Sequence, residues 1–296
     1  MCGVCGCGKD ETRIEAGDGR KPQGDHHHHH AHAHDHDHGH GHHHHHEDHH
    51  HHHHGHDHDH EPSHDDGRSR IVRIEQDLLA KNDAYAAGNR LTFNMAGVLA
   101  LNLVSSPGSG KTTLLVETIK RLQGALPVAV IEGDQQTSMD AERIRATGAP
   151  ALQINTGKGC HLDAHMTGHA FEQLRPAFGS VLFIENVGNL VCPAMFDLGE
   201  EHRVVLVSVT EGEDKPLKYP DMVRSSHLLL ITKVDLLPHL DFDVDALAAN
   251  ARKINPGIKI LKVSAKTGEG MDAWAGFIHS ARTLALTGCA TAEDWG

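Results

Sequence analysis

The sequence predicts an α/β fold in which a mostly parallel β-sheet is flanked by helices. Two observations predict it. From Val98 onward, short apolar runs alternate with stretches of helical periodicity, which is the pattern of parallel strands joined by covering helices. The first apolar run also leads through a glycine-rich turn into the first helical stretch, an order typical of sheets that bind phosphate.

The predicted elements follow in chain order. Strands are expected at Val98–Val104, Val128–Glu132, Val181–Glu185, Val204–Val209, Leu228–Thr232 and Ile258–Val263. Helices are expected at Thr112–Gln123, Ser138–Thr147, His161–Leu174, Val244–Lys253 and Met271–Leu286. Ligands of such sheets collect at the carboxyl ends of the strands, so candidate site residues are sought there.

Composition divides the 296 residues into five parts: a cysteine motif at 1–9, a histidine-rich tract at 10–67, a linker helix at 68–96, a nucleotide-binding domain at 97–288 and a tail at 289–296. Pro22–Gly67 has ten acidic residues and no Lys or Arg, although the whole chain carries −13. The remainder is therefore nearly neutral, which argues against nucleic-acid binding.

Six cysteines are too few and too clustered for a disulfide framework. The sequence has no apolar run of about 18 residues, as a membrane span requires, and its start lacks the pattern of a signal peptide. These features predict a cytoplasmic protein.

The N-terminal cysteines Cys2, Cys5 and Cys7 are spaced by glycines and can converge on one metal ion. Three thiolates with the terminal amine suit square-planar Ni²⁺, and Zn²⁺ or Cu⁺ could use them as well. The alternative is a reactive cluster without a function.

The tract at 10–67 holds 25 of the 32 histidines and few apolar residues. It cannot bury enough surface to offset the entropy of ordering, so we predict a disordered tail. Imidazoles favour Ni²⁺, Cu²⁺ and Zn²⁺, which indicates a metal reservoir. The alternative of a purification tag fits poorly, because the tract is internal and irregular.

In the linker helix, apolar residues recur at helical intervals and predict a face that packs on the nucleotide-binding domain. They are Ile71, Ile74, Leu78, Leu79 and Ala86.

The segment Ser105–Thr113 reads Ser-Ser-Pro-Gly-Ser-Gly-Lys-Thr-Thr. Between a strand and a helix it predicts the phosphate-binding loop of a P-loop NTPase, although Ser105 replaces the usual first glycine. A chance glycine-rich loop is the alternative. Lys111 is expected at the β- and γ-phosphates and the Thr112 hydroxyl at Mg²⁺. The loop residues expected to contact nucleotide are Gly108, Ser109, Gly110, Lys111, Thr112 and Thr113.

Two further strand ends carry carboxylates. Asp134 is a candidate to hold Mg²⁺ or to orient the attacking water, with a helix N-cap as the alternative. Glu185 is expected near the Mg²⁺ shell, and the Gly188 N–H near the γ-phosphate.

Two later strand ends resemble guanine-reading loops. Thr232-Lys233-Val234-Asp235 is similar to Asn-Lys-x-Asp with Thr first, and Asp235 would accept hydrogen bonds from guanine that adenine cannot donate. Ser264, Ala265 and Lys266 match the second guanine loop.

Cys160 and His161 are adjacent, and Cys192 lies seven residues after Glu185. Together they are candidate ligands for one metal ion. A buried structural cysteine beside a hydrogen-bonded histidine is the alternative.

Taken together, the chain resembles the hydrogenase nickel incorporation GTPases, the HypB family. The resemblance rests on the cysteine motif, the histidine tract, Ser105–Thr113, Glu132–Asp134, Glu185–Pro193, Thr210–Pro220 and Thr232–Asp235. It implies a SIMIBI-class GTPase that binds GTP or GDP with Mg²⁺, dimerises across the nucleotide and delivers nickel to the [NiFe]-hydrogenase large subunit.

The resemblance further implies partnership with a HypA-type accessory protein and a SlyD-type nickel chaperone. It places a nickel site at Cys2, Cys5 and Cys7, a zinc or nickel site at Cys160, His161 and Cys192, and dimer contacts at Leu236 and Leu240. A urease-type GTPase of the UreG kind and a plain nickel or zinc storage protein are the alternatives. Our hypothesis is that GTP orders the loops at Asp134 and Glu185 and so changes metal affinity.

Overall fold

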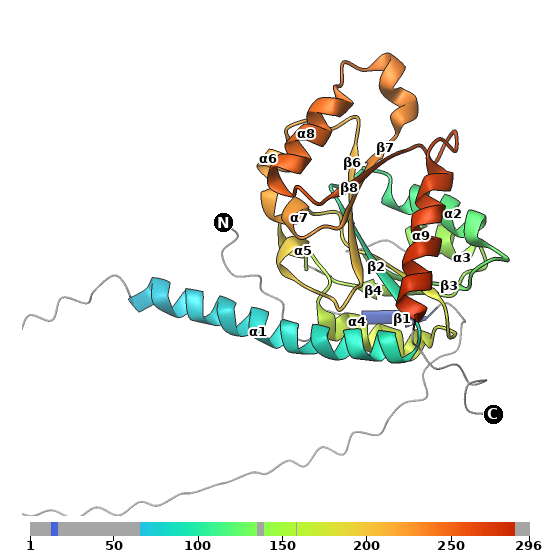
Figure 1. Cartoon of the computed structure of the whole chain (residues 1–296). Helices are drawn as coiled ribbons and strands as arrows, with labels where there is room; N and C mark the ends of the chain where they lie inside the picture. The colour runs from blue at the N-terminus through green and yellow to red at the C-terminus, as the bar shows by residue number, and fades with distance from the viewer. Residues whose placement is uncertain (1–12, 17–65, 135–138, 158, 288–296) are drawn as a thin grey trace, which may run out of the picture. The chain divides into compact units, whose positions relative to one another are not determined.

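The computed structural model describes residues 13–16, 66–134, 139–157 and 159–287. Its main unit, which includes everything described from Arg73 onward, is a parallel sheet with helices on both faces (Figure 1). The predicted cysteine motif at 1–9, nearly all of the histidine tract and the tail at 289–296 lie outside the described residues. Among the described residues, no helix is long and apolar enough to cross a membrane.

Seven parallel strands form the sheet. They are β2 (Leu99–Ser105), β3 (Val128–Asp134), β4 (Ala151–Asn155), β5 (Val181–Glu185), β6 (His202–Ser208), β7 (Leu228–Thr232) and β8 (Lys259–Val263). Their order is β4-β3-β5-β2-β6-β7-β8, and β1 (Arg13–Ala16) pairs antiparallel with β4 at the edge. All six expected strands are confirmed.

The sequence reading missed two strands. The segment of β4 is only five residues long and has Gln153 at its centre, so it does not form an apolar run. Gln153 is nevertheless buried, and it lies beside Glu132 in the β3–β4 register. The strand β1 lies in the tract predicted to be disordered, and it corrects that expectation for four residues that add to the free edge of β4.

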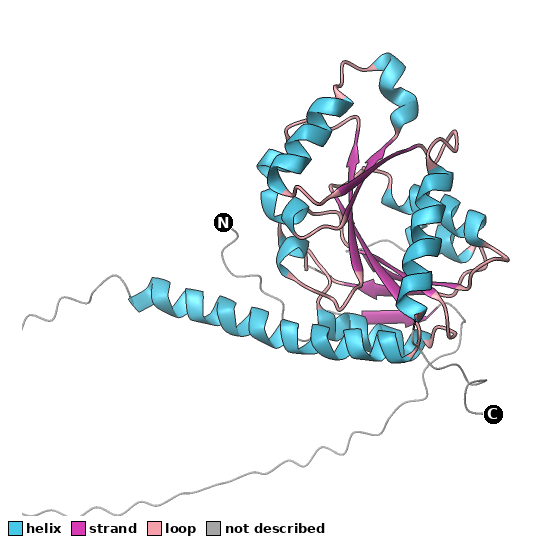
Figure 2. Cartoon of the chain, viewed as in Figure 1, coloured by secondary structure: helices cyan, strands magenta, loops and turns pink. Residues whose placement is uncertain are grey.

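Helices surround the sheet (Figure 2). They are α1 (Asp66–Met95), α2 (Lys111–Leu122), α3 (Met139–Arg145), α4 (Ala164–Leu174), α5 (Cys192–Met195), α6 (Lys215–Lys218), α7 (Pro220–Arg224), α8 (Val244–Ile254) and α9 (Met271–Leu286), with the 3-10 helix η1 (Val234–His239). The five predicted helices correspond to α2, α3, α4, α8 and α9. The helix α4 begins three residues later than expected because the Asp163 side chain caps it by accepting from the Met166 amide.

Alternating residues of β2 divide the core between the two faces of the sheet. Leu101 and Leu103 pack against α2 and α9 on one face. Ala100 packs toward α1 and α4 on the other face, and Val104 toward α7 and α8. The sheet is therefore buried on both sides, which explains the nearly continuous apolar sequences of its central strands.

The linker helix packs on the domain through only part of the predicted face. Ile74 and Leu78 are 51% and 58% exposed, whereas Ala86 is fully buried. The helix docks through a later face made of Asn82, Ala86, Asn89 and Phe93, all buried. Asparagines are acceptable there because their amides are paired. Asn82 accepts from the Ala164 amide and donates to Asp197, and Asn89 donates to the carbonyls of Ala164 and Leu198.

Candidate nucleotide and metal site

The glycine-rich loop connects β2 to α2, as predicted. Gly108 and Gly110 have φ values of 74° and 96°, a left-handed conformation that side chains disfavour. Ser105, the departure from the usual motif, is fully buried inside the loop. Its hydroxyl accepts from the Ser109 hydroxyl at 2.6 Å and from the Lys111 ammonium at 3.0 Å. Ser105 thus holds both side chains in place from beneath the loop.

Lys111 and Thr112 begin α2 beside a buried carboxylate. The Thr112 hydroxyl donates to Glu185 Oε1 at 2.7 Å, and Glu185 is only 5% exposed. Burial raises the pKa of Glu185, while the Lys111 charge and the Thr112 hydrogen bond oppose that rise. Burial likewise lowers the pKa of Lys111. Burial therefore disfavours the charged forms of both Lys111 and Glu185, and the attraction between their opposite charges offsets part of that cost.

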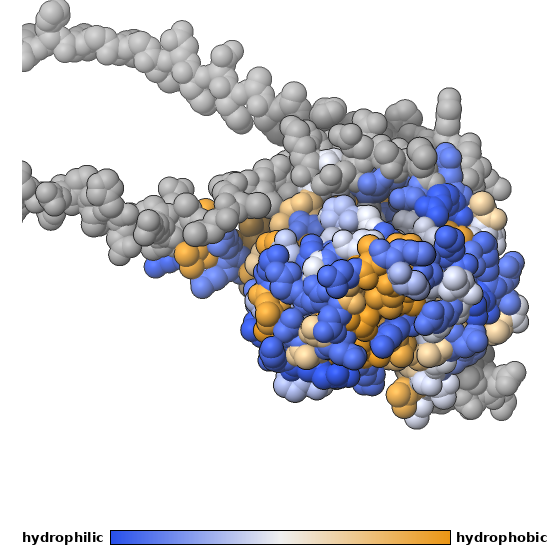
Figure 3. All heavy atoms as spheres, turned by 90° about the horizontal axis from the view of Figure 1, so that it is seen from above, coloured by the Kyte–Doolittle hydropathy of each residue, from blue (hydrophilic) through white to orange (hydrophobic). Residues whose placement is uncertain are grey.

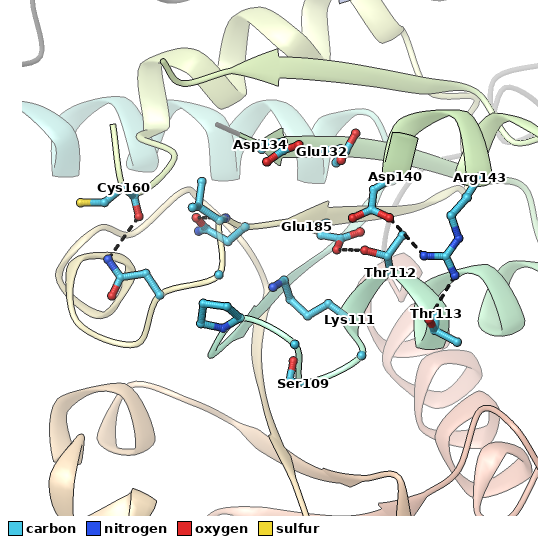
Figure 4. Close-up of a pocket in the computed structure, with 18 of the residues that line it drawn as sticks. Ser109, Lys111, Thr112, Thr113, Glu132, Asp134, Asp140, Arg143, Cys160 and Glu185 are labelled. Atoms are coloured by element: carbon cyan, nitrogen blue, oxygen red, sulfur yellow. Dashed lines mark hydrogen bonds and ion pairs between the residues drawn. The ribbon is translucent and has the colours of Figure 1, made fainter. Parts of the chain in front are cut away.

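These residues line a cleft of about 610 Å³ at the carboxyl ends of the strands, a size that suits a small-molecule ligand. Figure 4 shows Glu132, Asp134 and Glu185 facing Lys111 and Thr112 across it. The cleft brings together most of the predicted nucleotide contacts: Gly108, Ser109, Gly110, Lys111, Thr112, Thr113, Asp134, Glu185, Gly188 and Lys233.

Three cleft residues were not singled out from the sequence. Asp140 and Arg143 of α3 form an ion pair at 3.1 Å, and Arg143 also donates to the Thr113 hydroxyl. Glu132 is 3% exposed and lies beside Glu185 in the β3–β5 register. Burial, with the charges of Glu185 and Asp134 adding to it, raises the pKa of Glu132 to about 8. The sequence placed Glu132 at the end of a predicted strand and in the Glu132–Asp134 segment of the family resemblance, and neither observation assigned it a role.

The two segments predicted to read guanine lie next to each other. The Ser264 hydroxyl donates to Asp235 Oδ1 at 2.6 Å and accepts from the Lys266 amide. Thr232 donates to the Ser109 carbonyl at 2.8 Å, and the Lys233 ammonium to the Gly108 carbonyl at 2.6 Å. Hydrogen bonds therefore tie the base-reading segment to the phosphate-binding loop. Asp235 and residues 264–266 lie outside the lining of the cleft.

The three predicted metal ligands of the domain also come together. The Cys160 sulfur lies 2.9 Å from the Cys192 sulfur and 3.5 Å from His161 Nδ1. Among the described residues, this trio is the only group of three or more such side chains placed to hold one ion. Burial lowers the pKa of His161, so its imidazole is neutral and able to ligate. Figure 4 shows the Cys160 sulfur turned away from Lys111.

The remaining predicted residues are Cys2, Cys5 and Cys7, which lie outside the described residues, and two leucines of the expected dimer contact. Leu236 is half-buried in η1, and Leu240 follows η1 and is 38% exposed. Figure 3 shows a mostly hydrophilic face of the molecule with a group of apolar side chains in it.

A P-loop between strand and helix, followed by segments that resemble guanine-reading loops at the carboxyl ends of a parallel sheet, is typical of a P-loop GTPase. Residues 99–262 match the family model "CobW/HypB/UreG, nucleotide-binding domain". The hydrogenase maturation factor HypB of Azotobacter chroococcum is 56% identical over 288 residues, covering 97% of this chain and 94% of the relative. The HypB of Escherichia coli K12 is 59% identical over 213 residues, 72% and 73% of the two chains.

Solved structures agree. HypB of Archaeoglobus fulgidus superposes with a TM-score of 0.65 at 42% identity, covering 69% of this chain and 99% of that one. HypB of Helicobacter pylori in complex with nickel gives a TM-score of 0.65 at 38% identity, covering 69% and 96%. The chain belongs to the HypB family of hydrogenase maturation factors, and it is a GTPase with the SIMIBI-class fold.

Proposed function

We propose that this GTPase is a nickel metallochaperone that stores nickel and inserts it into the large subunit of a [NiFe]-hydrogenase. Nickel is its cargo, and GTP binding is coupled to metal binding and release. The observation that carries the proposal is the placement of Cys160, His161 and Cys192 around one point at the end of the nucleotide cleft. The nickel complex of the H. pylori relative supports the choice of metal.

Two asparagines form the physical link between nucleotide and metal. Asn186 follows Glu185 directly, is fully buried, and accepts from the amide of Leu162, the residue after His161. Asn189 donates to the Cys160 carbonyl at 3.4 Å and accepts from the amide of Val191, the residue before Cys192. A shift of this segment therefore moves both metal-ligand segments.

The segment also touches the phosphate-binding loop. A Cβ placed on Gly188 would lie 3.1 Å from Pro107 Cα, so backbone meets backbone there without an intervening side chain. A change in the loop when the γ-phosphate arrives is transmitted through Gly188 to Asn189 and the cysteines. Such coupling between two sites is reciprocal, so nickel must change nucleotide affinity by the same factor.

The site fits Mg²⁺, which resides beside the nucleotide in P-loop GTPases. Glu185 Oε2 is buried without a hydrogen-bond partner among the described residues, while Oε1 of the same carboxylate accepts from the Thr112 hydroxyl. We assign Thr112, Glu185 and Asp134 to hold the ion, which would neutralise phosphate charge when bound. Lys111 binds the phosphate oxygens directly and offsets their negative charge.

For the complete cycle, we propose that GTP brings two domains together through the surface at Leu236 and Leu240, and that hydrolysis separates them. The trio would bind Zn²⁺ or Ni²⁺. The implied partners are a HypA-type protein, a SlyD-type chaperone and the hydrogenase large subunit precursor. Metal ligation by Cys160 and Cys192 needs reduced sulfur, so we place the protein in a reducing compartment, the cytoplasm.

The coupling is tested by measuring GTP affinity of the full chain with and without nickel, in wild type and in the Cys160→Ala variant. Nickel should change the affinity of the wild type at least about fivefold and leave the variant unaffected. Cys289→Ala removes a cysteine from outside the described residues and serves as the matched control. An equal nickel effect in wild type and Cys160→Ala would rule the coupling out.

The function itself needs a maturation assay. In cells with limiting nickel, Lys111→Ala should abolish hydrogenase activity, and deletion of residues 26–64 should be tolerated when nickel is plentiful. The opposite pattern would favour a storage protein. One relative, 39% identical, is named "Hydrogenase/urease maturation factor HypB", so urease activity is measured in parallel as the second candidate function.

A further inference from the structure

Arg143 is a cation of the nucleotide cleft that has no role in the site described above. It lies on α3, lines the cleft and is half-exposed. Its guanidinium donates to Asp140 Oδ1 on the same helix and to the Thr113 hydroxyl on α2, both at 3.1 Å. Figure 4 shows the side chain extending from α3 to the beginning of α2.

The contact with Thr113 places this cation at an electrostatically unfavourable point. The helix α2 begins at Lys111, so Thr113 lies in its first turn, where the backbone amides form the positive end of the helix dipole. That turn has no acidic residue and no side-chain cap, and Lys111 adds a second cation to it. Positive charge gathered in this way is favourable when an anion lies among the groups.

A stabilising surface ion pair does not account for the arrangement. Arg224 of α7 pairs with Asp221 at the same i,i+3 spacing, and exposed pairs of this kind contribute little to stability. Arg143 differs because it also bonds Thr113, which lies 30 residues earlier in the phosphate-binding loop. The second bond holds the guanidinium at the nucleotide cleft.

The charge of the cleft leaves a need for this cation when a nucleotide binds. Four carboxylates and three cations line it: Glu132, Asp134, Asp140, Glu185, Lys111, Arg143 and Lys233. The phosphates of GTP add further negative charge to this excess. Burial raises the pKa of Glu185, and the charge of Arg143 opposes that rise. The field of Arg143 therefore reaches the carboxylate that lies beside Lys111 and Thr112.

We propose that Arg143 is a phosphate-binding residue that contacts the phosphates common to GTP and GDP. A guanidinium has five N–H donors in a fixed fork, which matches phosphate oxygens. The described bonds to Asp140 and Thr113 use one donor on each terminal nitrogen, so three donors remain for a ligand. The shared phosphates are favoured because the loop amides beside Thr113 cradle the α- and β-phosphates, whereas Lys111 reaches toward the γ-phosphate.

The inference rests on GTP binding and does not depend on nickel. It is tested by measuring the affinities of the full chain for GTP, GDP and guanosine with Mg²⁺. Arg143→Ala should bind GTP and GDP about 10–100-fold more weakly than wild type, because hydrogen bonds from a charged donor are lost. Guanosine, which has no phosphate, should bind equally well to both proteins.

Arg224→Ala is the matched control, because Arg224 has the same i,i+3 partner spacing and lies outside the lining of the cleft. It should bind all three ligands as wild type does. Unchanged GDP affinity in Arg143→Ala would overturn the proposal. An equal loss for guanosine would also overturn it, because the effect would then come from the fold.

Two further measurements separate a direct charge contact on the shared phosphates from other roles. Arg143→Lys should bind GDP more tightly than Arg143→Ala and more weakly than wild type, because lysine keeps the charge and loses the fork. A lysine variant no better than alanine would overturn the contact. In GTP hydrolysis, KM should rise in Arg143→Ala with kcat nearly unchanged. A fall in kcat with both affinities unchanged would instead assign Arg143 to the γ-phosphate and overturn the proposal.

A crystal of the full chain with GDP and Mg²⁺ gives the geometry. We expect a terminal nitrogen of Arg143 at about 2.7–2.9 Å from an oxygen of the α- or β-phosphate. An occupied nucleotide site in which Arg143 still contacts Asp140 and Thr113 and no phosphate would overturn the proposal.

Discussion

Two groups of buried charge lie in this domain, and their polar atoms are satisfied to different degrees. In the first, which we call the Arg203 cluster, Arg203 pairs with Glu200 at 2.9 Å, and both side chains are at most 6% exposed. Arg203 also donates to the carbonyls of Ala194 and Phe196, and Glu200 accepts from Asn102. Both Glu200 oxygens are bonded, because the Leu198 amide takes the second one.

In the second group, Glu132 and Glu185 are neighbours in the β3–β5 register, and each has an Oε2 without a hydrogen-bond partner in the part of the chain described. Buried polar groups are normally paired, and an unpaired one costs free energy. The difference indicates that the buried charges of the Arg203 cluster serve stability. Those of the cleft serve ligand binding, because their Oε2 atoms remain available to a ligand.

The largest expected effect is the loss of stability on breaking the ion pair of the Arg203 cluster. Arg203→Leu leaves Glu200 buried without its counter-charge, so the free energy of unfolding should fall by about 3–5 kcal/mol. Urea denaturation measures it. The double variant Arg203→Leu with Glu200→Leu should recover part of the loss, because no charge then stays unpaired. A loss below about 1 kcal/mol in the single variant would contradict our account of the cluster.

The next effect concerns activity. Lys111→Ala should lower the GTP hydrolysis rate by about 10²–10³-fold, the usual consequence of removing one donor to the reacting group. Its effect on unfolding should be much smaller than that of Arg203→Leu, because Glu185 has a raised pKa and can take up a proton when its counter-charge is lost. Hydrolysis within tenfold of wild type would contradict the role of Lys111.

The third prediction concerns the free energy that the buried Glu132 carboxylate costs the folded protein when it is ionised. The pKa of Glu132 is about 8 in the folded protein against an ordinary value of 4.5, so the folded state binds the proton more tightly. This contribution to stability is complete below pH 4.5 and is lost as the pH rises through about 8. The groups acting on Glu132 are Glu185, Asp134 and Asp140, which raise its pKa, and Arg145, which lowers it.

Glu132→Gln should therefore be more stable than wild type at pH 8.5, by roughly 4 kcal/mol from proton linkage, and the two proteins should converge toward pH 5. Melting temperatures in metal-free buffer across this range provide the measurement. A constant difference at all pH values would show that Glu132 does not titrate in the folded protein.

The smallest effect is expected at a half-exposed pair. Arg90 donates to both carboxylate oxygens of Asp197, but each side chain is 40% exposed. Arg90→Ala should cost at most about 1 kcal/mol, because solvent screens such pairs. This variant is the matched control for Arg203→Leu in the same denaturation series. Equal losses in the two variants would show that burial is not what makes the Arg203 cluster important.

The sequence predicted those parts of the domain in which local pattern determines structure. The central strands follow from apolar runs, and the phosphate-binding loop follows from glycines at fixed spacing before Lys111. The trio was predicted because Cys160 and His161 are adjacent and Cys192 lies shortly after a switch-like segment. The structure brings these three side chains together, and their metal occupancy stays a prediction.

Missed features depend on residues far apart in the chain. Asn102 and Glu200 are 98 residues apart, and no local pattern indicates that they share a hydrogen bond. The docking face of α1 was only partly predicted for the same reason: Ala86 was assigned to it, and Asn82 and Asn89 were not. Its asparagines are polar in the sequence, and only distant backbone groups make their burial favourable: the Asp197 carbonyl and the Ala164 amide for Asn82, and the carbonyls of Ala164 and Leu198 for Asn89. Polar burial of this kind cannot be read from hydrophobic periodicity.

The way α1 is attached has a mechanical consequence. A helix held mainly by an apolar interface can translate or rotate at little cost in free energy, because apolar contacts have no fixed direction. Asn82 and Asn89 instead fasten α1 by directional bonds at set heights along its axis. The helix can therefore detach as a whole, but it cannot shift along its axis by one turn without breaking these hydrogen bonds.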